Sequence, residues 1–249
     1  MNVTVCIKRV PDTEARIRVD GSGAGIDKTG IKYDLSPYDA FALEAALQLK
    51  EATGEGEVTL LTLGDSSSQE TLRKGLAMGA DRALLLTGEV TLDGLATAKT
   101  LAAELEGTED GLFLFGVKAA DDDQQQVGPM VAALTGRPCV SGVSSFEVNG
   151  STATCHREVE GGSEVVEVDT PAVLCMTKGP NEPRLAALKG IMAAKKKPLE
   201  EKPAAENASR VRLASMSEPP ARATGRIVGE GVDAVPELVR LLREEANAI

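Results

Sequence analysis

One acidic stretch of the chain has the residue types of a ligand-binding loop. Asp121–Asp123 is followed by three glutamines, and the stretch begins at Gly116, directly after the apolar run Leu112–Phe115. Ligands bind at the carboxyl ends of parallel strands, and free N–H groups at the start of a helix can hold a phosphate. The carboxylates would repel a phosphate unless they point elsewhere. The stretch therefore predicts either a nucleotide-binding loop or only an acidic helix start, with Asp123 as N-cap and Gln126 at N3.

A second junction between a strand and a helix has a similar character. The extended segment ending at Tyr33 is followed by Ser36 and Pro37, which suit the N-cap and the first position of a helix. This junction either places hydroxyls and backbone amides beside the same crevice or only caps a helix. Neither junction contains a G-x-G-x-x-G or G-x-x-x-x-G-K-[ST] motif, so the nucleotide hypothesis depends on position and not on a phosphate-binding motif.

A basic segment, residues 181–197, contrasts with the rest of a chain whose net charge is −11. Apolar residues recur in it at helical spacing, at Leu185, Leu188, Ile191 and Met192. The segment predicts either an amphipathic helix with solvated lysines or a docking loop that offers an apolar anchor to an acidic partner. From Pro183 onward it has no acidic residue, and its basic residues are Arg184, Lys189, Lys195, Lys196 and Lys197.

The remaining reactive residue types exclude several classes of protein. The single histidine, His156, excludes a multi-histidine metal site. The cysteines are widely spaced and form no C-x-x-C pair, so we expect reduced cysteines in the core. No arrangement typical of a catalytic site is present, and we expect no enzyme activity. Six aromatic residues and an acidic net charge argue against nucleic acid as a partner.

The chain also lacks the patterns of targeting and membrane segments. No apolar run approaches the roughly 18 residues of a membrane span. The N-terminus enters a predicted strand at once and shows no signal-peptide pattern. We therefore expect a cytoplasmic chain without direct membrane insertion.

The elements that must position these residues alternate between strands and helices as far as Cys139. Apolar strands are predicted at 3–10, 58–63, 83–86 and 112–115, with helices beginning near residues 36, 67, 92 and 123. This alternation predicts a doubly wound, mostly parallel α/β sheet. Beyond Cys139, short runs separated by turns predict an antiparallel extension at the sheet edge, at 140–148, 152–159, 164–168 and 172–176.

The composition changes again toward the C-terminus. We expect residues 1–197 to form one α/β nucleotide-binding domain that includes the basic segment. Residues 198–226 are rich in proline, alanine and glutamate and predict an extended arm, and 232–248 predict an amphipathic helix. We therefore treat 198–249 as a separate C-terminal arm.

Six segments, in order along nearly the whole chain, resemble the β subunit of electron transfer flavoproteins. They are VCIKRVPD, YDLSPYDAFALEAAL, TLGDSSSQETLRKGLAMGADRA, GVKAADDDQQQVGPMVAALTG, REVEGG and EPRLAALKGIMAAKKKP. The resemblance implies a Rossmann-like fold similar to adenine-nucleotide-binding domains. It also implies a heterodimer with an α subunit, on which the C-terminal arm and terminal helix would pack.

The resemblance further implies two nucleotides: an FAD shared with the α subunit, and an AMP without redox role held by this subunit. Arg157 and Glu158 match family residues near the flavin and the subunit boundary. The residues that match the family's AMP pocket are Cys6, Ser36, Pro37, Tyr38, Asp39, Leu63, Gly116, Val117, Lys118, Ala119, Ala120, Asp121, Asp122, Asp123, Gln124, Gln125, Gln126 and Val127.

Three departures from the family pattern bear on the cofactors. Val127 stands where AMP-type members have a threonine that contacts phosphate, and the following Gly-Pro resembles flavin-bifurcating members with a second FAD in this pocket. Those members have glycine between two aspartates, where this chain has Asp122. Thr13 replaces a tyrosine that approaches the flavin in some members. We favour AMP and keep a second FAD as the alternative.

The basic segment matches the family's recognition loop, with Leu188 as the residue that inserts into an apolar pocket of a partner dehydrogenase. The implied role is to accept electrons from primary flavoprotein dehydrogenases, such as acyl-CoA dehydrogenases, and to pass them to a membrane ETF:quinone oxidoreductase. The implied partner-binding residues are Arg184, Leu185, Leu188, Ile191, Met192, Lys195, Lys196 and Lys197.

Two rival functions use a related fold. A nucleotide-binding sensor would be a monomer without flavin. An adenylating enzyme would need a phosphate-gripping SGG-type loop after the first strand, and the segment Lys8–Pro11 does not provide one.

Overall fold

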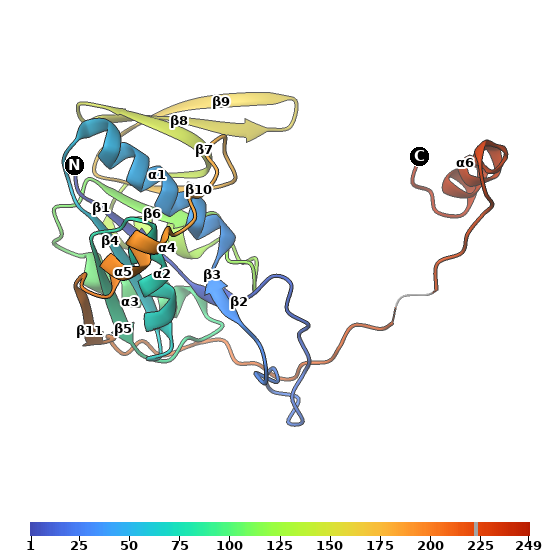
Figure 1. Ribbon diagram of the computed structural model, residues 1–249, viewed down its shortest axis with the longest axis horizontal. Coiled ribbons are helices and arrows are strands. Elements are labelled where there is room, and N and C mark those ends of the chain that lie inside the picture. The colour runs from blue at the N-terminus through green and yellow to red at the C-terminus, as the bar shows by residue number, and fades with distance from the viewer. Residues whose placement is uncertain (222–223) are drawn as a thin grey trace. The chain divides into compact units, whose positions relative to one another are not determined.

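The computed structural model describes residues 1–221 and 224–249. A nine-stranded sheet forms the centre of the unit Met1–Ser215, in the order β11-β5-β4-β1-β6-β10-β7-β8-β9 (Figure 1). Neighbouring strands from β11 to β7 pair in parallel, and β8 and β9 add an antiparallel edge. The strands are β1 Val3–Cys6, β4 Val58–Gly64, β5 Arg82–Thr87, β6 Leu112–Gly116, β7 Cys139–Asn149, β8 Thr152–Val159, β9 Gly162–Asp169, β10 Ala172–Met176 and β11 Leu199–Pro203. A separate antiparallel pair joins β2 Arg9–Pro11 to β3 Tyr33–Leu35.

Helices cover both faces of the sheet, because alternate side chains of each strand point to opposite faces. Leu114 packs in one apolar cluster with residues of α1 and α2, whereas Phe113 packs in a second cluster with residues of α3 and α4. This arrangement confirms the predicted doubly wound, mostly parallel α/β fold. The helices are α1 Pro37–Thr53, α2 Ser68–Met78, α3 Gly94–Leu105, α4 Val127–Thr135 and α5 Leu188–Ala194.

Local sequence accounts for most helix boundaries. Ser36 and Pro37 occupy the N-cap and first position of α1, as expected, although the Ser36 hydroxyl makes no capping hydrogen bond. The helix ends at Gly54, whose φ of 72° is a left-handed conformation that glycine adopts at little cost. At α3 the Asp93 carboxylate accepts hydrogen bonds from the N–H groups of Leu95 and Ala96, which stabilises the first turn.

The helix expected from Asp123 begins four residues later, at Val127, so the predicted capping box is wrong. Asp123 and Gln125 have φ values of 51° and 57°. Left-handed residues break the helical repeat, and Gln126 therefore becomes the N-cap of α4, without a side-chain capping bond. Residues 117–126 form a loop that leads into the helix.

The antiparallel extension beyond Cys139 consists of β7, β8 and β9, whereas the expectation for residues 172–176 is wrong. This run, β10, returns into the sheet between β6 and β7 and pairs in parallel with both. All five of its residues are buried. A continuous apolar run suits a strand covered on both faces, which explains the central position.

The predicted arm begins with a strand of the sheet. Residues 199–203 form β11, which pairs in parallel with β5. A second unit, Met216–Ile249, contains the amphipathic helix α6, Val235–Glu244, after a short 3-10 turn at Val232–Ala234. No helix in the described part of the chain is long and apolar enough to cross a membrane.

Candidate functional site

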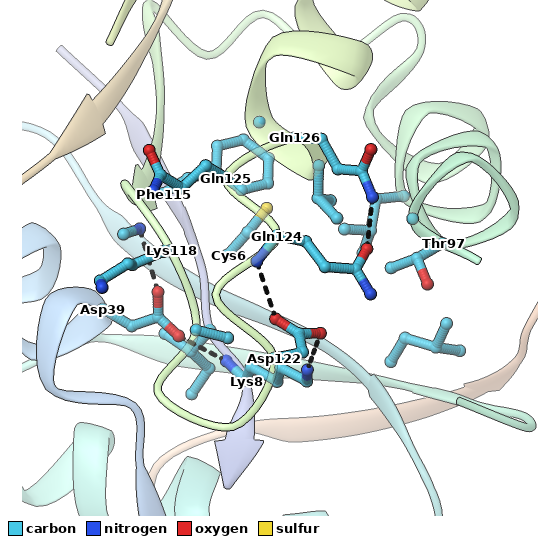
Figure 2. A pocket seen from close by; sticks show the side chains of 18 of the residues that line it. Cys6, Lys8, Asp39, Thr97, Phe115, Lys118, Asp122, Gln124, Gln125 and Gln126 are labelled. Atoms are coloured by element: carbon cyan, nitrogen blue, oxygen red, sulfur yellow. Dashed lines mark hydrogen bonds and ion pairs between the residues drawn. The ribbon is translucent and has the colours of Figure 1, made fainter. Parts of the chain in front are cut away.

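A cavity lies at the carboxyl ends of β1, β4 and β6, with an empty volume of about 790 Å³ including space open to solvent (Figure 2). The chain runs from β1 to β4 on one side of β1, and β6 pairs with the other side. The strand order therefore reverses at β1, which makes this edge the switch point where open α/β sheets bind ligands.

Apolar side chains and a polar loop share the wall of the cavity. Cys6, Leu63 and Phe115 come from the strand ends, and Leu101 comes from α3. Opposite them runs the loop 117–126, with Lys118, Asp122 and the three glutamines (Figure 2). Burial raises the pKa of the Cys6 thiol well above its ordinary value, so Cys6 contributes a neutral, apolar surface and no thiolate.

Most residues that match the family's nucleotide pocket line this cavity. Ser36 does not, since it is fully buried and its hydroxyl has no hydrogen-bond partner in the described part of the chain. The predicted residues outside the lining are Ser36, Pro37, Tyr38, Ala120, Asp121 and Asp123. Those that form it are Cys6, Asp39, Leu63, Gly116, Val117, Lys118, Ala119, Asp122, Gln124, Gln125, Gln126 and Val127.

Asp39 joins two strand ends at the cavity. One carboxylate oxygen accepts a hydrogen bond from the Lys8 amide at 2.7 Å, and the other accepts from the Gly116 amide at 2.9 Å. Burial raises the pKa of Asp39 to about 7, although the two amide bonds act in the opposite direction. Gly116 has no side chain for a physical reason: a Cβ there would lie 2.8 Å from the Asp39 nitrogen.

Two lysines neutralise much of the acidic loop. The Lys8 ammonium lies 2.8 Å from an oxygen of Asp121 and 2.7 Å from one of Asp122, and Lys118 lies 2.7 Å from Asp123. Figure 2 shows Lys8 between Asp39 and Asp122. Burial lowers the pKa of Lys8, but the two carboxylates outweigh burial and the pKa is raised. The carboxylates therefore point to lysines, which weakens the electrostatic objection to a phosphate.

The start of α4 faces the same cavity, and its N-cap Gln126 makes no side-chain capping hydrogen bond. Val127 and Gly128 line the cavity, and no acidic residue lies in the first turn. The first N–H groups of a helix have no partner within the helix, so they remain available to an anion. Gln124 donates to the Leu92 carbonyl oxygen at 3.1 Å and holds the loop beside the start of α3.

Sequence reasoning missed several lining residues because it considered two strand-to-helix junctions and omitted a third. The junction between β5 and α3 also reaches the cavity, and the strand-end rule that selected Gly116 would have selected it. The same rule would have selected Lys8, which lies two residues after the end of β1. The missed lining residues are Ile7, Lys8, Val90, Thr91, Gly94, Thr97, Leu101, Phe115 and Gly128.

Comparisons with known proteins identify the family. The electron transfer flavoprotein domain family matches residues 24–207. The electron transfer flavoprotein subunit beta of Bradyrhizobium diazoefficiens is 40% identical over 253 residues, covering 100% of both chains. That of Syntrophomonas wolfei is 41% identical, covering 90% of this chain and 88% of its own. The mitochondrial subunit beta of Arabidopsis thaliana is 36% identical, covering 100% of both chains.

The chain belongs to the electron transfer flavoprotein β subunits. It is therefore a component of an electron-transfer flavoprotein, in general an electron carrier and not a catalytic enzyme, and the name β subunit implies an α partner. In the described part of this β subunit, no group of three or more His, Cys, Asp or Glu side chains could hold a metal ion.

The basic segment of the β subunit contains helix α5, which packs on α2 (Figure 1). Its apolar side chains are exposed, with Leu185 94% and Leu188 77% accessible, and Ile191 and Met192 also exposed. Four exposed apolar side chains in one short segment are typical of a surface that binds another protein.

The two residues matched to the flavin boundary lie on β8. Arg157 forms an ion pair with Glu164 on β9 at 3.0 Å, and Glu158 is exposed. The structure therefore places both on the antiparallel part of the sheet, and neither lines the strand-end cavity.

Proposed function

We propose that this β subunit holds one AMP in the strand-end cavity and pairs with an electron transfer flavoprotein α subunit around a shared FAD. The observation that carries the AMP proposal is the composition of the cavity. Leu63, Leu101 and Phe115 offer an apolar wall to an adenine ring, while the start of α4, which has no side-chain capping bond, offers N–H groups to a phosphate.

The FAD would supply the electron chemistry, and the protein would supply binding and position. In this proposal the heterodimer accepts electrons from primary flavoprotein dehydrogenases, such as acyl-CoA dehydrogenases, and passes them to a membrane ETF:quinone oxidoreductase. Arg157 and Glu158 would lie near the flavin and the subunit boundary, as the family resemblance implies. The protein acts in the cytoplasm without catalytic residues of its own, and the C-terminal arm beyond β11, with helix α6, packs on the α subunit.

A second FAD in place of AMP is the alternative that one observation favours. Leu63, Val90, Thr91 and Thr97 line both the cavity and a neighbouring groove that runs along α3 and residues 203–213. This continuity gives room for a ligand larger than a mononucleotide. We favour AMP because Asp122 keeps a carboxylate in the cavity, held by Lys8.

Co-expression with an electron transfer flavoprotein α subunit tests the pairing. We expect a stable yellow heterodimer whose flavin absorbance corresponds to one FAD per heterodimer. The opposite result would be a β subunit that purifies as a stable monomer, separate from the α subunit and without flavin. That result would support the sensor function and contradict this proposal.

A further inference from the structure

The whole basic segment 181–197 is called the docking segment from here on. Its first part is fixed to helix α1. The Arg184 guanidinium donates to both oxygens of Glu44, at 2.8 and 2.9 Å, and to Glu51 at 2.5 and 3.1 Å. The Arg184 amide also donates to Glu44 at 3.1 Å, and Gln48 donates to the other oxygen at 2.9 Å. The carboxylate of Glu44 is therefore fully engaged.

This contact differs from an ordinary surface ion pair, because Glu44 is only 3% exposed. Burial alone would raise the pKa of Glu44, but the hydrogen bonds from Arg184 outweigh burial and the pKa lies below its ordinary value. Removing Arg184 would leave a buried carboxylate without its partner, which is far more costly than losing an exposed pair.

The last part of the docking segment is fixed to helix α2. The Lys197 ammonium donates to three carbonyl oxygens at the end of α2, those of Leu76, Gly79 and Ala80, at 3.1, 3.2 and 2.5 Å. A cation at this position also interacts favourably with the helix dipole. In return, the Arg73 guanidinium of α2 donates to the carbonyl oxygens of Ala194 and Lys197.

The middle of the docking segment remains free to meet another protein. Lys189, Lys195 and Lys196 are exposed, and none of them takes part in an ion pair within residues 1–221 and 224–249. They accompany the exposed apolar side chains described above. The basic residues thus fall into two groups, one bound to the body of the subunit and one open to solvent.

We propose that Arg184 and Lys197 are positioning residues that hold the docking segment in its binding conformation and make no contact with the partner. This inference deepens the proposed acceptance of electrons from a primary dehydrogenase, and it rests on the role of partner-recognition loop that the family resemblance implies for residues 181–197. The two contacts fix the ends of the segment on α1 and α2, so Leu188 and its neighbours stay exposed before a partner arrives. The three exposed lysines then provide the charge that an acidic partner meets.

A docking segment that is already ordered before the partner binds loses less conformational entropy on binding. If only a fraction of molecules has the segment in place, the apparent dissociation constant rises by the inverse of that fraction. A fall of the ordered fraction to about one tenth would therefore weaken docking about tenfold without any change at the contact surface.

The experiment uses the αβ heterodimer loaded with flavin and measures its reduction by an acyl-CoA dehydrogenase. Arg184→Gln should raise the KM for the heterodimer about tenfold with kcat unchanged, and should speed amide hydrogen exchange in residues 185–193. Glu44→Gln should act similarly, and the double variant should be no worse than either single variant. The matched control, Lys196→Gln, should reduce the salt dependence of KM and leave hydrogen exchange unchanged.

Four results separate this inference from the function on which it rests. If Leu188→Ala accepts electrons at the wild-type rate below saturation, the docking function itself is wrong. If Leu188→Ala is impaired but Arg184→Gln has a normal KM, Arg184 is not a positioning residue. The same conclusion follows if Arg184→Gln only reduces the salt dependence of KM, as Lys196→Gln does. If Arg184→Gln does not fold, Arg184→Lys takes its place. The lysine keeps the charge but loses the bidentate geometry, and an unchanged KM with it would overturn the inference.

Discussion

Single residues around the cavity are arranged so that lysines offset most of the negative charge of the loop and one buried carboxyl group joins the strand ends. Lys8 and Lys118 neutralise carboxylates of the loop 117–126, and Asp39 receives two backbone amides. The shape of the cavity thus depends on a few contacts between residues far apart in the sequence.

The close approach at Gly116 gives a first prediction. A methyl group there would lie 2.8 Å from the Asp39 nitrogen and 2.8 Å from the Tyr38 carbonyl carbon, and neither backbone atom can move freely. Gly116→Ala should therefore lower stability by roughly 1–3 kcal/mol and reduce the nucleotide retained after gel filtration. Gly21→Ala is the control, because a Cβ at Gly21 meets nothing within 4 Å. Equal nucleotide retention by both variants would contradict the account of Gly116.

The raised pKa of Asp39 predicts a pH dependence. Its pKa is about 7 when folded, against an ordinary value of 3.8, so the folded state binds more protons between these values. Stability should therefore fall as pH rises from about 4 to about 7, with each unit of pKa difference worth about 1.4 kcal/mol. Asp39→Asn cannot titrate, so its free energy of unfolding in urea should lack this decline. Parallel pH profiles for the wild type and the variant would show that Asp39 is not the source.

The sequence predicts a site residue only where its place relative to a neighbouring strand or helix is enough to identify it. Gly116 and the acidic loop follow an apolar strand, and the strand-end rule selects them. The pairing of Lys8 with Asp121 joins residues more than a hundred positions apart and depends on how β1 and β6 pair. The sign of a charge does not specify which distant residue it contacts. The contacts of Arg184 with Glu44 and of Lys197 with the end of α2 could not be predicted for the same reason.

At the scale of elements, periodicity predicts the type of an element better than its place in the sheet. The strand and helix alternation predicts the doubly wound fold, and the structure confirms it. Periodicity failed for β10, because a fully buried run has no alternation that distinguishes an edge from a centre. It also failed for α4, because a left-handed backbone is uncommon outside glycine, and nothing in the sequence around Asp123 and Gln125 indicates that the chain adopts it there.

The packing of α5 on α2 gives a prediction at this scale. Glycine normally weakens a helix relative to alanine, but at Gly190 a Cβ would overlap the carbonyl oxygen of Ala77. Gly190→Ala should therefore displace α5 and speed hydrogen exchange in residues 185–193, although it favours helix formation locally. Lys189→Ala, at an exposed neighbouring position, is the control and should leave exchange unchanged. Slower exchange in Gly190→Ala would show that intrinsic helix propensity outweighs the close packing.

For the whole molecule, the net charge of −11 and the small number of reactive side chains fit an electron carrier in which the flavin supplies the chemistry. The chain as a whole is acidic, whereas the docking segment exposes three lysines. Such a contrast favours association with an acidic partner and should weaken with salt.

The central claim is that this β subunit binds AMP in the strand-end cavity and shares one FAD with an α subunit. The most direct test is to denature the purified αβ heterodimer and quantify the released nucleotides by chromatography. We expect one FAD and one AMP per heterodimer, with the AMP reduced in Gly116→Ala. Two FAD and no AMP per heterodimer would contradict the claim.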